Sequence, residues 1–186
     1  MIVQPIWIIF TLSILAASIS FSYVIFPSYS QSNNLTDLQD EEAIVKANLE
    51  RFDILDYDAF SNQNWTLFNE IHAPDVLVVW PDGRQTVGIE QHDKDIMDMF
   101  VYAPDTKIMV HPIKFGSGNW TAVIGFMTGT FSESMPLANG SMIPPTGKQF
   151  NLTMATIAEW NDNGRIAKEY LFWDNDAFMK QIGLRE

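Results

Sequence analysis

The sequence lacks cysteine, so disulfide bonds, thiolate catalysis and zinc sites built on sulfur are excluded. Basic residues are also scarce: 11 Lys and Arg stand against 23 Asp and Glu, which gives a formal net charge of -12. The resulting long-range negative field repels phosphate, so nucleic acid is not expected as a partner. A neutral or small-molecule partner fits this composition better.

No charged side chain occurs before Asp37. Residues 6–26 are almost entirely apolar and about as long as a bilayer crossing, which needs roughly 20 residues. We interpret residues 1–30 as either a signal peptide or a retained membrane anchor. The basic start of a typical secretory signal is missing, so the sequence does not decide between the two. The membrane is expected as a partner only through this segment. Residues 31–36 then form a linker, and residues 37–186 form a single domain.

Asn-X-Ser/Thr sequons favour a location outside the cytoplasm, either secreted or held at the cell surface. An alternative is that Asn and Thr are frequent because they suit turns and helix caps. The asparagines of the sequons are Asn34, Asn64, Asn119, Asn139 and Asn151.

Hydrophobic spacing predicts helices first and strands afterwards. The expected helices cover residues 36–60, 64–72 and 87–100, with a short one after Asp174. The expected strands cover residues 75–80, 106–115, 119–131, 149–160 and 165–174. Tight turns join the later strands, so the sheet is predicted to be mostly antiparallel and the fold class to be α+β. We expect the sheet to wrap around the helices as a cone, with the Pro/Gly-rich segment 132–148 as a lid.

Several stretches resemble the SnoaL-like polyketide cyclases and ester cyclases, which have the nuclear-transport-factor-2-like fold. They include "VVWPDGRQTVGIEQH", "HPIKFGSGNWTAVIGFMTGTF" and "EYLFWDNDAFMKQIGL", and the resemblance covers roughly residues 40–186. It implies three N-terminal helices packed on a strongly curved sheet. It also implies proton transfer without a cofactor on a small apolar carbonyl compound, an isomerase or lyase type of reaction. Several cyclases carry a histidine in a Gly-Thr-His motif, where this chain has Gly129, Thr130 and Phe131.

Asp174 is the first candidate for acid/base catalysis, because the resemblance implies an aspartate at the end of the last strand. Strand alternation places it on one face with Tyr170 and Phe172. If that face is concave, Asp174 enters an apolar pocket in which its pKa would rise toward neutrality. Alternatively it caps the C-terminal helix. A bulge in the strand would exchange the faces and favour Glu169.

His92 and His111 are the other catalytic candidates, since each lies on an apolar face of its expected element. Either could polarise a carbonyl oxygen, or be a core histidine bonded to the backbone. A metal site drawn from His72, Asp75, His92 and His111 lacks diagnostic spacing, so no metal is expected. No cofactor is expected either.

Aromatic and apolar side chains on the strands are expected to line a ligand pocket. The set comprises Trp80, Phe126, Met154, Trp160, Tyr170 and Phe172. On the opposite, convex face Leu171 and Trp173 would form an exposed apolar patch, which predicts a homodimer through the sheet. The function expected from the sequence is therefore exported acid/base catalysis on a small apolar carbonyl compound. A non-catalytic module that binds a hydrophobic ligand is the alternative, and an interaction domain using the convex sheet is a third.

Overall fold

The computed structural model describes residues 35–137 and 139–186. The expected signal or anchor segment, residues 1–30, lies outside the described residues, as does most of the expected linker. Within the described part of the chain, no helix combines the length and the apolarity needed to cross a bilayer.

The helical part begins with α1 (Leu35–Ile54), which runs directly into a π-helical turn, η1 (Leu55–Phe60). Hydrogen bonds five residues apart, such as that from the Ser61 amide to the Asp56 carbonyl at 3.1 Å, mark this wider turn. The sequence predicted one continuous helix here. The other helices are α2 (Trp65–Ile71), α3 (Ile89–Tyr102) and α4 (Asn175–Gln181). Asn64 caps α2, which begins where the sequence predicted a helix, because its side chain accepts from the Leu67 amide at 3.2 Å.

The main sheet of the described residues has the order β2-β1-β9-β8-β5-β3, with β4 also paired to β5. Within this described sheet only β1 and β9 run parallel, and the other strand pairs are antiparallel. The strands are β1 (His72–Val79), β2 (Gln85–Val87), β3 (Lys107–Ile108), β4 (Ile113–Ser117), β5 (Trp120–Thr130), β8 (Gln149–Trp160) and β9 (Ile166–Trp173). The segment expected as a lid instead holds a separate two-stranded hairpin, β6 (Met135–Pro136) with β7 (Met142–Ile143).

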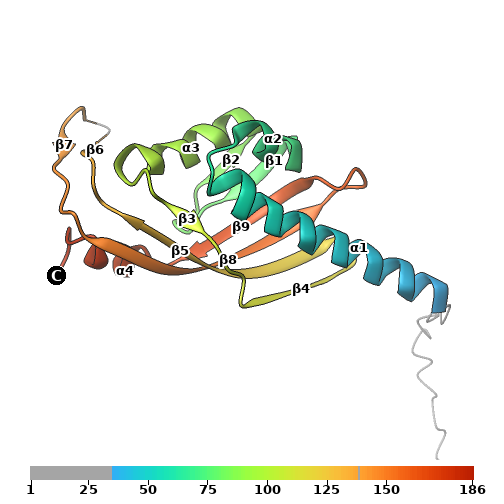
Figure 1. Cartoon of the computed structure of the whole chain (residues 1–186). Helices are drawn as coiled ribbons and strands as arrows, with labels where there is room; N and C mark the ends of the chain where they lie inside the picture. The colour runs from blue at the N-terminus through green and yellow to red at the C-terminus, as the bar shows by residue number, and fades with distance from the viewer. Residues whose placement is uncertain (1–34, 138) are drawn as a thin grey trace, which may run out of the picture. The chain divides into compact units, whose positions relative to one another are not determined.

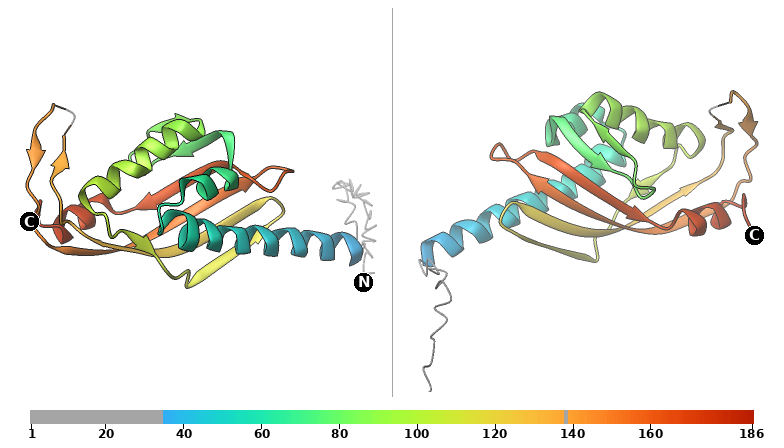
Figure 2. Two further views of the ribbon diagram at one scale, coloured as in Figure 1. Left: turned by 45° about the horizontal axis from the view of Figure 1, so that its top comes forward. Right: turned by 180° about the vertical axis from the view of Figure 1, so that it is seen from behind.

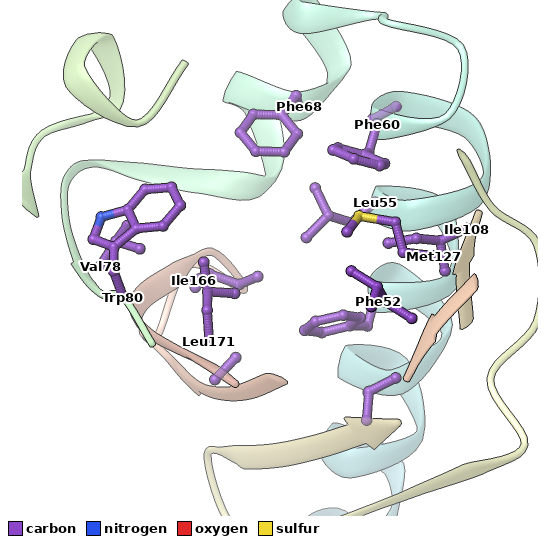
Figure 3. Packing of buried hydrophobic residues seen from close by; sticks show 14 of the residues in the cluster. Phe52, Leu55, Phe60, Phe68, Val78, Trp80, Ile108, Met127, Ile166 and Leu171 are labelled. Carbon is purple, nitrogen blue, oxygen red and sulfur yellow. The ribbon is translucent and has the colours of Figure 1, made fainter. Parts of the chain in front are cut away.

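The first three helices lie against the same face of the sheet (Figure 1, Figure 2). The hydrophobic core fills the space between these two layers. Figure 3 shows Phe60 and Phe68 from the helical side, Trp80 from directly after β1, Leu171 from β9 and Met127 from β5, directed toward one interior. The architecture is thus the expected α+β arrangement of helices packed on a mostly antiparallel sheet.

A β-bulge near the start of β9 decides which side chains face the helices. Trp160 pairs with Ile166, whereas the preceding Glu159 pairs with Lys168, so Ala167 is an extra residue in β9. Ile166 is buried, and unbroken alternation from it would turn even-numbered residues inward. The extra residue reverses the alternation, so that Glu169 is buried instead.

Candidate functional site

A cavity of about 280 Å³ lies between the helices and the sheet. Its walls are largely apolar and aromatic, with Phe60, Phe68, Trp80, Tyr102 and Trp173 among the lining residues. One imidazole, His92 of α3, and five carboxylates also line it: Asp56 of η1, Glu169 of β9, Asp95 and Asp98 of α3, and Asp82 in the turn after β1. Of these carboxylates, Asp56 and Glu169 lie against histidines. Arg84 lies at the wall as well, paired with Asp95 at 3.1 Å and stacked 4.7 Å above the Trp80 ring. An apolar pocket with a few convergent polar groups is the usual form of a small-molecule site.

Glu169 stands between two buried histidines. One of its oxygens, Oε2, lies 3.2 Å from His92 Nε2 and 3.9 Å from His72 Nε2. Burial alone would raise the pKa of Glu169, but the contact with His92 and the imidazoles around it outweigh burial and hold that pKa below its usual value. The carboxylate is therefore ionised at neutral pH, although its side chain is only 6% exposed.

His72 is held as a neutral ring with a known tautomer. Its Nδ1 lies 2.9 Å from the Phe68 carbonyl oxygen, which can only accept, so Nδ1 carries the proton and Nε2 carries a lone pair. Burial, which outweighs the pull of Glu169, lowers the pKa of His72 to about 4. The lone pair on Nε2 has no hydrogen-bond partner among the described residues.

His92 is similarly unsatisfied. Neither of its ring nitrogens makes a geometrically sound hydrogen bond within the described structure, despite the short distance to Glu169. Buried polar atoms are nearly always paired, so an unpaired imidazole on a cavity wall marks a place where a ligand or water completes the bonding. The ligating atoms of His72, His92 and Glu169 all lie within 4.8 Å of one another, a spacing that would also admit a divalent cation.

Asp56 belongs to a second cluster on the helical side of the cavity. Its Oδ2 lies 2.8 Å from His111 Nε2, while His111 Nδ1 lies 2.8 Å from Asp53 Oδ1. Lys114 in turn binds the other oxygen of Asp53. Burial, partly offset by His111, raises the pKa of Asp56. For His111 burial opposes the charged ring, but the bonds to both carboxylates prevail and raise its pKa.

The expectation that Asp174 enters the pocket is wrong. It is exposed and caps α4, accepting from the amides of Asp176 and Ala177 at 2.9 and 3.0 Å. The bulge at Ala167 is the cause, because it turns Glu169 rather than Asp174 toward the helices. Both outcomes were open in the sequence: the cap was one alternative, and Glu169 was the residue that a bulge would favour.

The other expected site residues divide into three groups. His92, Trp80 and Met154 line the cavity. His111 stands behind it and reaches it only through Asp56, while Trp160 lies in the core, 2% exposed, with its Nε1 donating to Thr121. The pocket assignment is incorrect for Phe126 of β5 and for Tyr170 and Phe172 of β9, since none of the three lines the cavity. Phe126 and Phe172 are exposed on the far face of the sheet.

The residues that sequence reasoning did not assign to the site are His72 and Asp56. In the sequence His72 was named only as a possible metal ligand, in a set of residues without the spacing typical of metal sites. Nothing in the local pattern shows that His72 of β1 lies near Glu169 of the parallel neighbour β9. Asp56 sits in a predicted amphipathic helix, where an acidic residue normally faces solvent. The π-helical turn that redirects it leaves no clear signal in the sequence.

Solved structures show the same fold. A protein assigned as a SnoaL-like polyketide cyclase from Jannaschia sp. CCS1 is 20% identical, with a TM-score of 0.66, covering 77% of this chain and 96% of its own. IdmH, assigned as a polyketide cyclase from Streptomyces antibioticus, is 23% identical, with a TM-score of 0.62 and coverage of 73% and 98%. A protein with a ketosteroid isomerase-like fold from Catenulispora acidiphila, in complex with trimethylamine, is 14% identical, with a TM-score of 0.55 and coverage of 67% and 86%.

A search of curated proteins finds no match. A family model does match the chain: the model of the SnoaL-like polyketide cyclases aligns with residues 54–182. That range includes Asp56, His92 and Glu169, and it spans more than half of the sequence. The chain therefore belongs to the SnoaL-like polyketide cyclase family.

Proposed function

We propose that this chain is an exported enzyme that transfers protons on a small apolar carbonyl compound without a cofactor, with Glu169 as the base. The observation that carries the proposal is the Glu169–His92 pair in the wall of an aromatic cavity. An ionised carboxylate beside a bound ketone or ester can take a proton from the carbon next to the carbonyl. The surrounding apolar walls exclude water and select an apolar ligand.

His92 completes the base. Its Nε2 is close enough to Glu169 to orient the carboxylate, and its unpaired nitrogens leave it able to bond the ligand. The Phe68 and Trp80 rings pack against it, with centroids 5.2 and 5.9 Å from that of His92, and limit its rotation. A fixed imidazole of this kind serves as a positioning group for proton transfer.

Export rests on the apolar segment and on the sequons. Asn64, Asn119, Asn139 and Asn151 are all exposed in the structure, so each could accept a glycan. Cell fractionation of the full chain, followed by a glycosidase-dependent mass shift in a host that glycosylates, tests this part. Protein confined to the cytoplasmic fraction would refute it.

Homodimerisation is also part of the proposal, but it rests on other residues than the two that the sequence suggested. Leu171 is buried and Trp173 lines the cavity, so they do not form the expected convex patch. The far face of the sheet instead exposes Phe126, Ile157 and Phe172 by 38%, 38% and 49% of their surfaces. Aromatic and β-branched side chains gathered on one sheet face favour burial against a second copy.

The test of catalysis needs no natural substrate. Full-length protein is incubated in D2O with 2-tetralone, a bicyclic ketone with acidic carbons next to its carbonyl, and deuterium incorporation is followed by NMR. The proposal expects catalysed exchange that Glu169→Gln reduces by about 10²-fold or more. Asp174→Asn is the matched control: it changes the carboxylate that directly follows the same strand, outside the cavity, and should exchange like the wild type.

Two results would overturn the assignment. Equal exchange by Glu169→Gln and the wild type would remove Glu169 as the base. Tight binding of 2-tetralone without any catalysed exchange would favour the alternative function, a non-catalytic module that holds a hydrophobic ligand. Phe131 in place of the family histidine is the feature of this chain that favours that alternative.

A further inference from the structure

The cluster around His111 is unusual because both ring nitrogens face carboxylate oxygens at 2.8 Å. A carboxylate can only accept, so both contacts are hydrogen bonds only if the cluster holds one more proton than a neutral imidazole between two carboxylates. That proton gives either a doubly protonated His111 or a protonated aspartate. The geometry alone therefore places a stored proton next to the cavity.

The two carboxylates are not equivalent. Asp53 is bound by Lys114 as well as by His111, and although burial opposes it, these two cations hold the pKa of Asp53 below its usual value. Asp53 therefore stays ionised and keeps a proton on His111 Nδ1. Among the described residues, Asp56 pairs with no cation other than His111, and it lines the cavity. The mobile proton is therefore the one between His111 Nε2 and Asp56.

Lys114, the other cation of this cluster, is bound to Asp53, and the His111 ring itself packs against aromatic side chains and a glycine. Tyr57 of η1 stacks on the ring, with centroids 4.7 Å apart and planes 29° apart, and Phe52 of α1 meets it edge-on at 5.9 Å. On β5 the facing residue is Gly125, where a Cβ would come within 3.2 Å of the ring and of Ile108. The ring side chain is 1% exposed, so its proton exchanges through Asp53 and Asp56 rather than directly with solvent.

We propose that Asp56 is a second catalytic residue, the acid opposite Glu169, and that His111 and Asp53 are the positioning residues that supply its proton. The inference rests on the proposed function. Asp56 lends a proton to the carbonyl oxygen of the ligand and regains one from His111 Nε2, while Glu169 takes a proton from the adjacent carbon. The return step reverses both transfers, so the cycle has no net gain or loss of protons. The ligand class is thus a ketone or ester that spans the cavity from β9 to η1 and passes through an enol.

The experiment compares Asp56→Asn, His111→Gln and Asp58→Asn in the 2-tetralone exchange assay across pH. Asp58 is an exposed carboxylate of the same π-helical turn and serves as the matched control. Asp56→Asn should lose about 10²-fold in exchange rate with its affinity for 2-tetralone retained. His111→Gln keeps a neutral hydrogen-bond donor near Asp56 but cannot supply a proton. Asp56 must then take its proton from solvent, so the pH–rate profile of this variant should shift to more acidic pH.

A measurement on the wild type stands independently of how the variants fold. Nitrogen-15 NMR of the ring, together with carbon-13 NMR of the Asp56 carboxyl group, should find the extra proton on His111 or on Asp56 at pH 7, protected from exchange with solvent. A neutral ring beside an ionised Asp56 at pH 7, or Asp56→Asn with the rate and pH profile of Asp58→Asn, would overturn the inference. If Glu169→Gln is inactive in that case, the proposed function survives without its second carboxylate; if Glu169→Gln is fully active, the proposed function fails as well.

Discussion

Replacing His72 by asparagine is expected to reduce the loss of stability that acid causes. The folded protein holds His72 as a neutral ring, with its pKa lowered from 6.5 to about 4. Between those two pH values the unfolded chain binds a proton at His72 that the folded chain does not. The free energy of unfolding therefore falls as the pH falls through this window, and the contribution is fully present only above pH 6.5.

The size of the effect follows from the shift. Each pKa unit corresponds to about 1.4 kcal/mol, so the wild type should lose about 3 kcal/mol at this one position on going from pH 6.5 to below pH 4. Asparagine is the chosen replacement because its side-chain amide can still donate to the Phe68 carbonyl, as Nδ1 of His72 does. It cannot titrate, so the variant should lack this component of the acid sensitivity.

The assay is urea unfolding of both proteins at several pH values between 7 and 4, with EDTA present so that no cation occupies the histidines. Other groups titrate in both proteins, and the difference between the two curves isolates His72. That difference should move by about 3 kcal/mol in favour of the variant as the pH falls. A constant difference would show that folded His72 takes up its proton normally, and the argument for a buried lone pair facing Glu169 would be refuted.

Three further predictions concern metal, assembly and the missing histidine. Removal of metal by EDTA should leave the 2-tetralone exchange rate unchanged, and elemental analysis should find no stoichiometric metal, although His72, His92 and Glu169 could hold one. Phe172→Glu should convert a dimer to monomers in analytical ultracentrifugation without changing exchange, since Phe172 lies on the far face of the sheet. Phe131→His should lower stability by about 1–3 kcal/mol in urea unfolding, because it buries an unpaired polar ring where Phe131 is 0% exposed and packs edge-on against Tyr102.

The order of the elements could be predicted from the sequence because it depends on local patterns. The change from a helix over residues 64–72 to a strand, and the tight turns between the later strands, both appear in the structure. The lid could not be predicted as a hairpin, since β6 and β7 have only two residues each and leave no periodicity to detect.

The question of which β9 side chains face the helices shows why the site was harder to predict than the fold. Alternation correctly separated Glu169, Leu171 and Trp173 from Tyr170 and Phe172, but it could not say which set is buried. A bulge of one residue, at Ala167, decides this and leaves no mark in composition. One signal was available: Glu169 shares its face with a leucine and a tryptophan, and a lone carboxylate on such a face needs a buried partner.

Each of the three histidines of the chain lies within ion-pair distance of a carboxylate that lines the cavity: His72 and His92 of Glu169, and His111 of Asp56. Stability does not explain this arrangement, because replacing a buried ionic cluster by apolar side chains of similar size is often neutral or stabilising by about 1–4 kcal/mol. The double variant Glu169→Met/His92→Leu should therefore unfold at an equal or higher urea concentration than the wild type, while losing ketone exchange. A large loss of stability would mean instead that the cluster holds the fold together. Retained stability with lost exchange would show that the cluster is kept for its chemistry, at the expense of a better-packed core.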